Sequence, residues 1–439
     1  MVAFSVWNKQ TCTLKLGCDR LGEKPLYYGL QGQGQHATFL FGSELKAPKA
    51  TRPLRRTTKF RESSKHMRFA LITSQAFSLS NFRGPLITAL VAQGIQVLAF
   101  APDYDEQSRA SVRALGAMPI DYSLSRTGVN PFSDTFNTVR LAVLLNRLRP
   151  DVTLSYFIKP VIFGTLAAWL AGVPRRVAMI EGLGYVFTPS GEHQPFLRKL
   201  LRSLVSRLYR FSLARAHKVI FLNGDDINEF VGAGLVQESK VVKLGGIGVD
   251  LADWPMTKSV TQPVTFLLAA RLLREKGIVE YAEAARLVKA RYPEARFVLL
   301  GGLDPNPGGL GQPEVQAWVT KGLLEWPGHV AVKAWLAQCS VYVLPSYREG
   351  VPRSTQEAMA MGRAVITTNA PGCRETVDDG VNGLLVPVRD VPALANAMLR
   401  FVKNPALIET MGLESRRLAE DRFDVNKINE RLLNILGVS

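Results

Sequence analysis

Cysteine is scarce in this sequence, and long apolar runs are absent. Four cysteines occur in 439 residues and none forms a C-x-x-C pair, so their spacing indicates neither a zinc ribbon nor a disulfide framework. A reducing cytoplasm is the expected compartment. No stretch reaches the roughly 18 to 20 uncharged apolar residues that cross a bilayer, and the best one, residues 161–173, is predicted to be a buried helix. The first residues lack a basic segment followed by an apolar core, so no secretory signal is expected.

Acidic residues are also few. The chain has 37 Asp and Glu against 54 Lys and Arg, a formal charge of +17, so its surface is expected to attract something anionic. Nucleic acid, an acidic membrane face and phosphorylated substrates all fit at this point. Hydrophobic residues make up 47% and charged residues 21%, which excludes a disordered chain. At about 150 residues per domain, the length predicts two or three domains.

The pattern changes at Met67. Residues 1–66 contain short β-like runs followed by a basic polar stretch at 46–65, which we interpret as a linker or tail. From Met67 onward, apolar runs alternate with segments of helical spacing, which predicts α/β domains with parallel sheets. The predicted strands are 68–73, 96–101, 152–156, 176–180 and 218–222 in a first series, and 264–269, 297–300, 341–345 and 364–367 in a second. Ligands bind beyond the carboxyl ends of such strands.

Two cations follow the first strand of the second series. Arg271 and Lys276 lie five residues apart across a turn that enters a helix. A guanidinium can fork onto phosphate oxygens, and an ammonium supplies a point charge. Cations near a helix start are more often solvated surface residues, so this pair by itself is a weak signal.

Two carboxylates follow a later strand. Glu349 lies in the loop after 341–345, and Glu357 lies eight residues on, in the first turns of a helix opening near Arg353. The simplest interpretation is an exposed loop acid and an acid near a helix N-terminus. The alternative is that both bind one polyhydroxylated ligand while the N–H groups of Gly350 and Val351 face a phosphate. A nucleotide sugar needs all of these contacts.

These elements carry a family resemblance. The segment 271–277, the E-x7-E element 349–357, and the stretches 360–366 and 380–386 resemble glycosyltransferase family 4 over residues 67–438. Four more segments are similar to the branch that extends polyprenyl-diphosphate-linked sugars, which includes bacterial N-acetylgalactosaminyltransferases that act on lipid-linked bacillosamine: 181–184, 301–307, 344–350 and 371–375.

The resemblance implies an α/β fold of the GT-B class, in which two Rossmann-like domains face a cleft. The expected parts are a non-catalytic 1–66, an acceptor domain 67–245, a nucleotide-sugar domain 246–425, and a C-terminal helix in 426–439 that packs back on the acceptor domain. The implied activity is metal-independent, retaining transfer from a UDP-sugar to a lipid-linked saccharide in bacterial surface polysaccharide or glycan assembly. No cofactor is expected.

Residue roles follow from the same resemblance. Arg271 and Lys276 match positions that neutralise the departing diphosphate, Glu349 matches the residue that holds the donor sugar, and Glu357 matches the ribose ligand. Gly350 and Val351 complete the expected donor contacts.

The acceptor-side candidates lie in the first domain. Asn81 and Arg83 follow the first strand, and the alternative to acceptor or phosphate contact is that they cap a helix. Glu181 and Gly182 stand where many relatives carry a histidine near the sugar, and the alternative there is a structural turn.

A basic amphipathic helix is predicted around residues 197–213. No acid occurs between Glu192 and Asp225. The apolar stripe is expected to pack on its own sheet, and the cationic face to touch anionic lipid, which places the protein peripherally on the inner face of the bacterial cell membrane. The expected membrane contacts are Arg198, Lys199, Arg202, Arg207 and Arg210.

Residues 3–48 resemble the glutaminase domain of asparagine synthetase. Val2 stands where that family has its nucleophilic cysteine, so glutamine hydrolysis is not expected. A fused remnant, or an upstream start in place of Met67, accounts for this segment.

Three alternative interpretations of the whole chain stay open. The first is a GT-B epimerase or hydrolase of sugar nucleotides. The second is an inactive fusion, since residues 328–335 form a shorter segment than usual and lack the aspartate that relatives carry there. The third is nucleic-acid binding, which the charge allows but which no zinc-finger spacing or aromatic-basic motif supports.

Overall fold

The computed structural model describes residues 67–124, 131–183, 196–306 and 308–438, together with four short strands in the first 66 residues. The chain divides into two compact units, Met1–His66 and Met67–Ser439. In the first unit, β1 (Phe4–Asn8) pairs antiparallel with β2 (Thr13–Gly17), and β3 (Tyr27–Gln31) pairs antiparallel with β4 (Thr38–Gly42).

The second unit contains a seven-stranded parallel sheet in the order β11-β10-β9-β8-β5-β6-β7. Its strands are β5 (Arg68–Ile72), β6 (Gln96–Ala101), β7 (Met118–Asp121), β8 (Val152–Tyr156), β9 (Arg175–Ile180), β10 (Lys218–Phe221) and β11 (Val241–Lys243). Its helices are α1 (Phe77–Ala92), α2 (Glu106–Ala114), α3 (Pro131–Leu148), α4 (Thr165–Leu170), α5 (Phe196–Leu213) and α6 (Gly224–Gly232), with a short π-helix at Pro160–Gly164 before α4. Buried apolar runs in β5, β6 and β8 explain why these strands form the centre of the sheet.

A six-stranded parallel sheet follows in the order β14-β13-β12-β15-β16-β17. Its strands are β12 (Thr265–Ala269), β13 (Arg296–Leu300), β14 (Glu325–Gly328), β15 (Val341–Leu344), β16 (Ala364–Thr368) and β17 (Gly383–Val386). The helices are α7 (Ile278–Lys289), α8 (Gln312–Thr320), α9 (Val332–Ala337), α10 (Arg353–Ala360), α11 (Val391–Lys403), α12 (Ala406–Arg422) and α13 (Val425–Leu436). The strand order reverses between β12 and β15, which makes this pair the switch point of the sheet.

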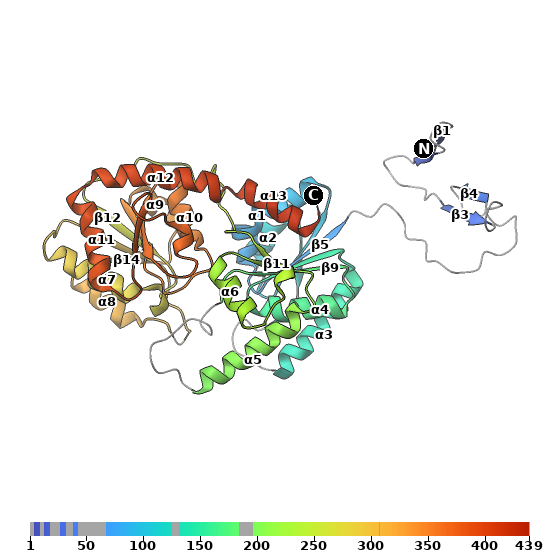
Figure 1. Cartoon of the computed structure of the whole chain (residues 1–439), viewed down its shortest axis with the longest axis horizontal. Helices are drawn as coiled ribbons and strands as arrows, with labels where there is room; N and C mark the ends of the chain where they lie inside the picture. Colours follow the sequence, from blue (N-terminus) through green and yellow to red (C-terminus); the bar gives the residue numbers. More distant parts are fainter. Residues whose placement is uncertain are drawn as a thin grey trace. The chain divides into compact units, whose positions relative to one another are not determined.

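The chain crosses between the two sheets twice. It leaves the first sheet after β11, and it returns when α12 is followed by α13, where Val249 and Asp424 form a parallel bridge. Figure 1 shows α13, in red, lying against the blue helices of the first sheet. Leu432, Leu433 and Leu436 of α13 join the core that contains Leu79 of α1. The C-terminal helix therefore belongs with the first sheet although it follows the second in sequence.

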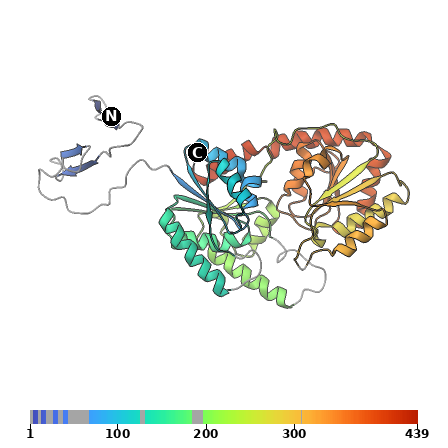
Figure 2. The ribbon, with the colours of Figure 1, turned by 180° about the vertical axis from the view of Figure 1, so that it is seen from behind.

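The two α/β halves confirm the predicted fold class, and Figure 2 shows the same two halves from behind. The predicted strands agree with the structure to within about a residue at each end. Two details differ. The first helix starts at Phe77, so Asn81 and Arg83 lie inside it and neither caps it. The edge strands β7, β11, β14 and β17 were not predicted. Each has only three or four residues, and β7, β11 and β14, unlike the central strands, are only partly buried.

Candidate active site

The loops after β12 and β15 carry the candidate donor-binding residues, and the strand order brings them together. Because β12 and β15 are hydrogen-bonded neighbours, the residues at their carboxyl ends meet at the switch point of the sheet. The Nζ of Lys276 lies 2.5 Å from the Oε1 of Glu349. Lys276 and Glu349 are 17% and 14% exposed, so neither is the solvated surface residue of the simplest interpretation.

Gly277 allows this approach. It has φ +72° and is the N-cap of α7. A Cβ atom built at this position would lie 2.1 Å from the carbonyl oxygen of Pro345, which is closer than any real contact. Only glycine permits both the left-handed backbone and the close packing of α7 against the end of β15.

Glu349 is held from two sides. In addition to Lys276, the Ser346 hydroxyl donates to its Oε1 over 2.7 Å. The backbone N–H of Glu349 donates to the carbonyl of Pro371. Among the described residues, these contacts leave Oε2 of Glu349 without a hydrogen-bond donor, so this oxygen can accept a hydrogen bond from a ligand.

Arg271 lies at the rim of the site. Its side chain is 55% exposed, and its Nη1 is 2.9 Å from Oδ2 of Asp304, whose side chain is 7% exposed. Asp304 belongs to the loop after β13. The guanidinium is therefore directed by a fixed carboxylate while most of its surface stays open to a ligand.

Glu357 sits in the second turn of α10. Its Oε1 accepts a 2.8 Å bond from Nε of Arg353. Burial raises the pKa of Glu357 above its ordinary value, and the nearby charge of Arg353 opposes that shift. The Arg353 guanidinium also lies over the ring of Phe82 in α1, 5.1 Å from its centroid, so the carboxylate lies close to where the two halves meet.

The loop after β15 touches the first domain at Gly350. A Cβ atom built there would lie 1.7 Å from the carbonyl oxygen of Glu181. Within the described parts of the chain, the N–H groups of Gly350 and Val351 donate to no protein acceptor. Two free N–H groups just before α10 can receive an anion.

The acceptor-side candidates differ from one another in exposure. Arg83 is buried, and it pairs with Glu181, lies over the ring of Tyr156 and donates to Sδ of Met179. Burial lowers the pKa of Arg83 to about 10, so the guanidinium is still charged at neutral pH. Glu181 is 12% exposed, so a ligand can reach the pair only through Glu181.

Asn81 has a different environment. Its amide donates to the carbonyl of Phe77 one turn earlier, and its side chain is exposed. Gly182 has φ +144° and lies next to Gly350. The four candidates thus comprise a buried ion pair, a glycine at the contact between the halves and an exposed amide.

The basic helix is α5. Its apolar stripe divides in two, which corrects the expectation that the stripe packs as a whole. Val205, Tyr209 and Leu213 are buried, whereas Leu200, Leu204 and Phe211 are 56%, 39% and 50% exposed. Arg207 and Arg210 are exposed, Arg202 pairs with Glu229 of α6, and the side chains of Arg198 and Lys199 lie outside the described residues.

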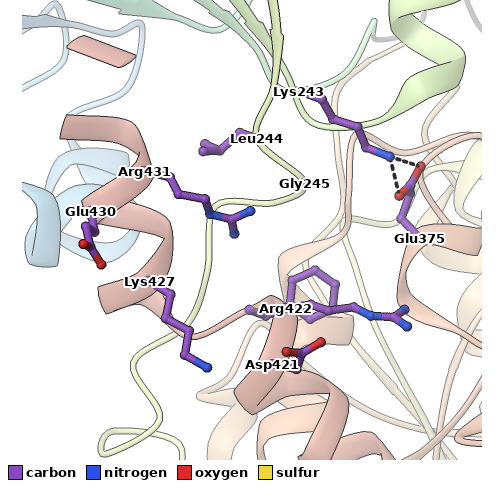
Figure 3. A pocket seen from close by; sticks show the side chains of 10 residues that line it. Lys243, Leu244, Gly245, Glu375, Asp421, Arg422, Lys427, Glu430 and Arg431 are labelled. Carbon is purple, nitrogen blue, oxygen red and sulfur yellow. Dashed lines mark hydrogen bonds and ion pairs between the residues drawn. The ribbon is translucent and has the colours of Figure 1, made fainter. Parts of the chain in front are cut away.

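One cavity of the structure is lined by other residues. It has a volume of about 600 Å³ and is formed where the chain crosses between the two sheets (Figure 3). Its cations are mostly occupied: Lys243 pairs with Glu375, Arg422 with Asp378, and Lys427 donates to a backbone carbonyl. With its acids Glu375, Asp421 and Glu430, this lining is nearly neutral. We therefore assign no donor site there.

Among the described residues, no cluster of three or more His, Cys, Asp or Glu side chains is placed to hold a metal ion. In the same residues, no helix combines the length and apolar character needed to span a bilayer.

Several residues of the site were not predicted. Ser346 and Arg353 lie within the segment 344–357, but a sequence does not show which side chain a neighbour binds. Asp304 lies in the segment 301–307, and only the pairing of β12 with β13 places it beside Arg271. Asn223, the N-cap of α6, and Asp226 in its first turn contact the loop of Glu349, and neither was predicted from the sequence.

Comparison with known proteins gives the family. A model described as Glycosyl transferases group 1 matches residues 263–404, and one described as Glycosyl transferase 4-like domain matches residues 81–245. A Glutamine amidotransferase domain model matches residues 1–84. An N,N'-diacetylbacillosaminyl-diphospho-undecaprenol alpha-1,3-N-acetylgalactosaminyltransferase of Campylobacter jejuni is 30% identical over 84% of this chain and 98% of its own length.

Other relatives are more distant. A UDP-Gal:alpha-D-GlcNAc-diphosphoundecaprenol alpha-1,3-galactosyltransferase of Escherichia coli is 23% identical over 70% of this chain and 80% of its own length. Among solved structures, Anabaena HepE in complex with UDP and glucose superposes with a TM-score of 0.65 at 17% identity, covering 85% of this chain and 100% of its own. Sucrose-phosphate synthase from Thermosynechococcus elongatus gives 0.66 at 18% identity, covering 84% and 98%. Because a nearly full-length relative, two domain models and the fold agree, the chain belongs to glycosyltransferase family 4 and is a transferase of the GT-B fold.

Proposed function

We propose that this enzyme moves a sugar, an N-acetylhexosamine or a hexose, from a UDP-sugar to a polyprenyl-diphosphate-linked saccharide, with retention at the transferred carbon. The observation that supports this most directly is the Lys276–Glu349 pair beside the free N–H groups of Gly350 and Val351. A cation and an anion-binding helix start can together bind the diphosphate of a nucleotide sugar. A carboxylate with an open oxygen can accept hydrogen bonds from its sugar hydroxyls. The name of the Campylobacter relative supports the acceptor class.

In this proposal the second domain holds the donor. Arg271 and Lys276 neutralise the leaving diphosphate, together with the N–H groups of Gly350 and Val351. Glu349 accepts hydrogen bonds from hydroxyls of the donor sugar, and Glu357 accepts from the ribose. Fixed cations and helix dipoles then take the place of a metal ion, so transfer is expected to persist in a chelator.

The acceptor enters from the first domain. Glu181 faces the donor loop through Gly182 and Gly350, and buried Arg83 keeps it in place. The role of Arg83 is therefore to orient Glu181, while Asn81 is exposed on α1 and free to touch the acceptor directly.

We also propose that the enzyme sits on an anionic, cytoplasmic membrane face through α3 and α5, which both pack on the segment 160–170 and lie side by side in Figures 1 and 2. On α3 the spacing 132, 136, 139, 143 makes one stripe, and these side chains are 90%, 63%, 51% and 47% exposed: Phe132, Phe136, Val139 and Val143. Exposed Arg140 lies over the ring of Phe136. Apolar side chains flanked by arginines fit an interfacial contact with anionic lipid.

Transfer is tested directly with a panel of UDP-sugars and short polyprenyl-diphosphate saccharides. UDP release that requires a lipid-linked acceptor supports the proposal, and the anomeric configuration of the product shows whether it is retained. UDP release without any acceptor favours a hydrolase, and loss of activity in EDTA contradicts metal independence. Absence of turnover with every pair favours an inactive fusion.

A further inference from the structure

Arg348, the residue before Glu349, is bound by the opposite domain. Its Nη2 lies 2.5 Å from Oδ1 of Asp226, and its Nη1 lies 2.7 Å from Oε2 of Glu229. Both acids are on α6 of the first domain. Arg348 is 9% exposed, Asp226 is fully buried and Glu229 is 25% exposed. Two carboxylates of the first domain thus bind the guanidinium of Arg348, which belongs to the loop after β15 that carries Glu349 (the donor loop).

These two ion pairs exist only while the two domains are in contact. Burial raises the pKa of Asp226, and the hydrogen bond and charge of Arg348 oppose the shift together with a hydrogen bond from the Asn223 amide, so Arg348 is the cation that compensates this carboxylate in its buried place. If the domains separated, the ion pair would break and both charges would have to be solvated again. The contact is therefore made only while α6 and the loop after β15 are packed together, as they are in this structure.

A second contact fixes the same loop. The amide of Asn223 donates to the carbonyl of Gly350 over 2.6 Å, while its oxygen accepts from the N–H of Asp226 and caps α6. The start of α6 thus holds the donor loop on both sides of Glu349. The carboxylate of Glu349 itself faces Lys276 and Ser346 of its own domain.

We propose that Arg348 is a positioning residue that sets Glu349 against the donor sugar only when α6 closes on the loop. The inference rests on the function proposed above, because it takes Glu349 as the ligand of that sugar. It assigns Arg348 no contact with substrate. Consequently, loss of the contact between Arg348 and α6 is expected to weaken binding of the sugar half of the donor and to leave binding of the UDP half almost unchanged.

The test compares Arg348→Gln, Arg348→Lys, Asp226→Asn and the double variant Arg348→Gln/Asp226→Asn in the full-length chain. Arg296→Gln is the control, because Arg296 makes a comparable two-bond pair with Glu325 at an exposed position away from the site. The probes are UDP and whichever of UDP-N-acetylgalactosamine, UDP-N-acetylglucosamine, UDP-galactose and UDP-glucose the unaltered protein binds most tightly. Binding is measured by calorimetry, and kcat and KM by transfer to a polyprenyl-diphosphate saccharide.

Arg348→Gln is expected to lower kcat and the affinity for the UDP-sugar by about 10-fold or more, with the affinity for UDP changed by less than about 3-fold. Arg348→Lys, which can still reach one carboxylate, is expected to fall between. Asp226→Asn is expected to add little in the Arg348→Gln background, because both changes remove one interaction. Arg296→Gln is expected to leave all values unchanged.

Equal losses of affinity for UDP and UDP-sugar, an unchanged kcat, or additive losses in the double variant would overturn the role of Arg348. If Arg348→Gln does not fold, the split between UDP and UDP-sugar is decided on Arg348→Lys and Asp226→Asn. A protein that binds UDP-sugar but transfers to no lipid-linked acceptor refutes the proposed function, and the binding comparison still decides the role of Arg348. A protein that binds no sugar nucleotide overturns both.

Discussion

Lys276 Nζ lies 2.5 Å from Glu349 Oε1, although 73 positions separate the two residues in the chain. The pairing of β12 with β15 brings them together, and Gly277 removes the side chain that would keep them apart. The ion pair neutralises two charges that are each less than one fifth exposed. A diphosphate that approaches Lys276 would compete with this carboxylate and free it to accept hydroxyls of the donor sugar.

The first prediction concerns this lysine. Lys276→Gln is expected to weaken UDP binding by about 10- to 100-fold, since a hydrogen bond to a charged group contributes about 1.5–3 kcal/mol. Lys289→Gln, at the end of the helix α7 that follows Lys276, is the control, because Lys289 donates to the carbonyl of Gly322 and not to a residue of the site. Calorimetry with UDP measures both. Equal UDP affinities in the two variants would show that Lys276 does not reach the diphosphate.

The second prediction is a pH dependence from Glu357. Its pKa is raised by burial, so the carboxylate takes up a proton in a window above the ordinary value for glutamate. UDP affinity is expected to fall as the pH is lowered through that window, because a protonated carboxyl loses capacity to accept from the ribose. In Glu357→Gln the affinity is expected to be about 10-fold lower at neutral pH and flat across the window. A wild-type profile as flat as that of the variant would contradict this role.

The same shift has a consequence for stability with the opposite sign. A folded-state pKa above the unfolded value means that the native protein holds the proton more tightly, so the contribution of Glu357 to stability improves as the pH falls and is least favourable above the raised pKa. Glu357→Gln removes the cost of burying this charge together with its hydrogen bond to Arg353, so it is expected to lower the free energy of unfolding at neutral pH by no more than about 1 kcal/mol, the net contribution of one hydrogen bond. Denaturant unfolding measures this, and a larger loss would mean that the Arg353 pair stabilises the fold.

How far the sequence predicts this site depends on the kind of contact. The donor loops could be predicted because their residues lie in segments such as 271–277 and 349–357, and because apolar alternation identifies the strands that precede them. The ion pairs between α6 and Arg348 could not be predicted. In the sequence Asp226 and Glu229 are ordinary acids in the first turns of a helix, and only the fold brings Arg348 to them. The same holds for Arg83, whose burial depends on long-range packing against Met179 and Tyr156.

The division of the α5 stripe illustrates a second limit. A helical wheel groups Leu200, Leu204 and Val205 on one side. How much of that side is buried depends on the surface that α4 and the segment before it offer to α5. That surface buries Val205 and leaves Leu200 and Leu204 exposed. Periodicity predicts which side of a helix is apolar, whereas the amount that is covered depends on its neighbours.

The third prediction tests the contact between the domains at Gly350. An alanine Cβ there would lie 1.7 Å from the carbonyl oxygen of Glu181, which is backbone and cannot turn away. Gly350→Ala is expected to push the loops apart and to lower kcat/KM by about 100-fold or more, since a displacement of about 1 Å in a positioned group can cost that much. Gly232→Ala on α6, where a Cβ atom meets nothing within 4 Å, is the control and is expected to keep full activity. Equal activities of Gly350→Ala and Gly232→Ala would show that the contact between Gly350 and Glu181 is not needed during turnover.

The fourth prediction concerns the first 66 residues. The sheet of the first domain begins with β5 at Arg68, and Met67 packs against its core. A chain that starts at Met67 is expected to keep the melting temperature of the main transition within about 2 °C and to keep its kcat/KM, since a change of about 1 kcal/mol already shifts a domain of this size by about 2–4 °C. Loss of transfer on deletion would show that the segment has become part of the working enzyme.

The fifth prediction addresses the membrane surface. Arg207 and Arg210 are exposed on α5, and each cation near an anionic leaflet contributes about 1 kcal/mol. Reversing both to glutamate exchanges two attractions for two repulsions, so the partition coefficient onto vesicles containing phosphatidylserine is expected to fall by about 100-fold or more at low salt. Arg291→Glu/Lys321→Glu, at exposed positions on the second domain, changes the net charge equally and serves as the control. Sedimentation with anionic and neutral vesicles measures the binding of each variant. An equal loss of binding in both double variants would assign the binding to the net charge of the protein and not to the arginines of α5. Equal binding of the unaltered protein to neutral vesicles would exclude the electrostatic contact.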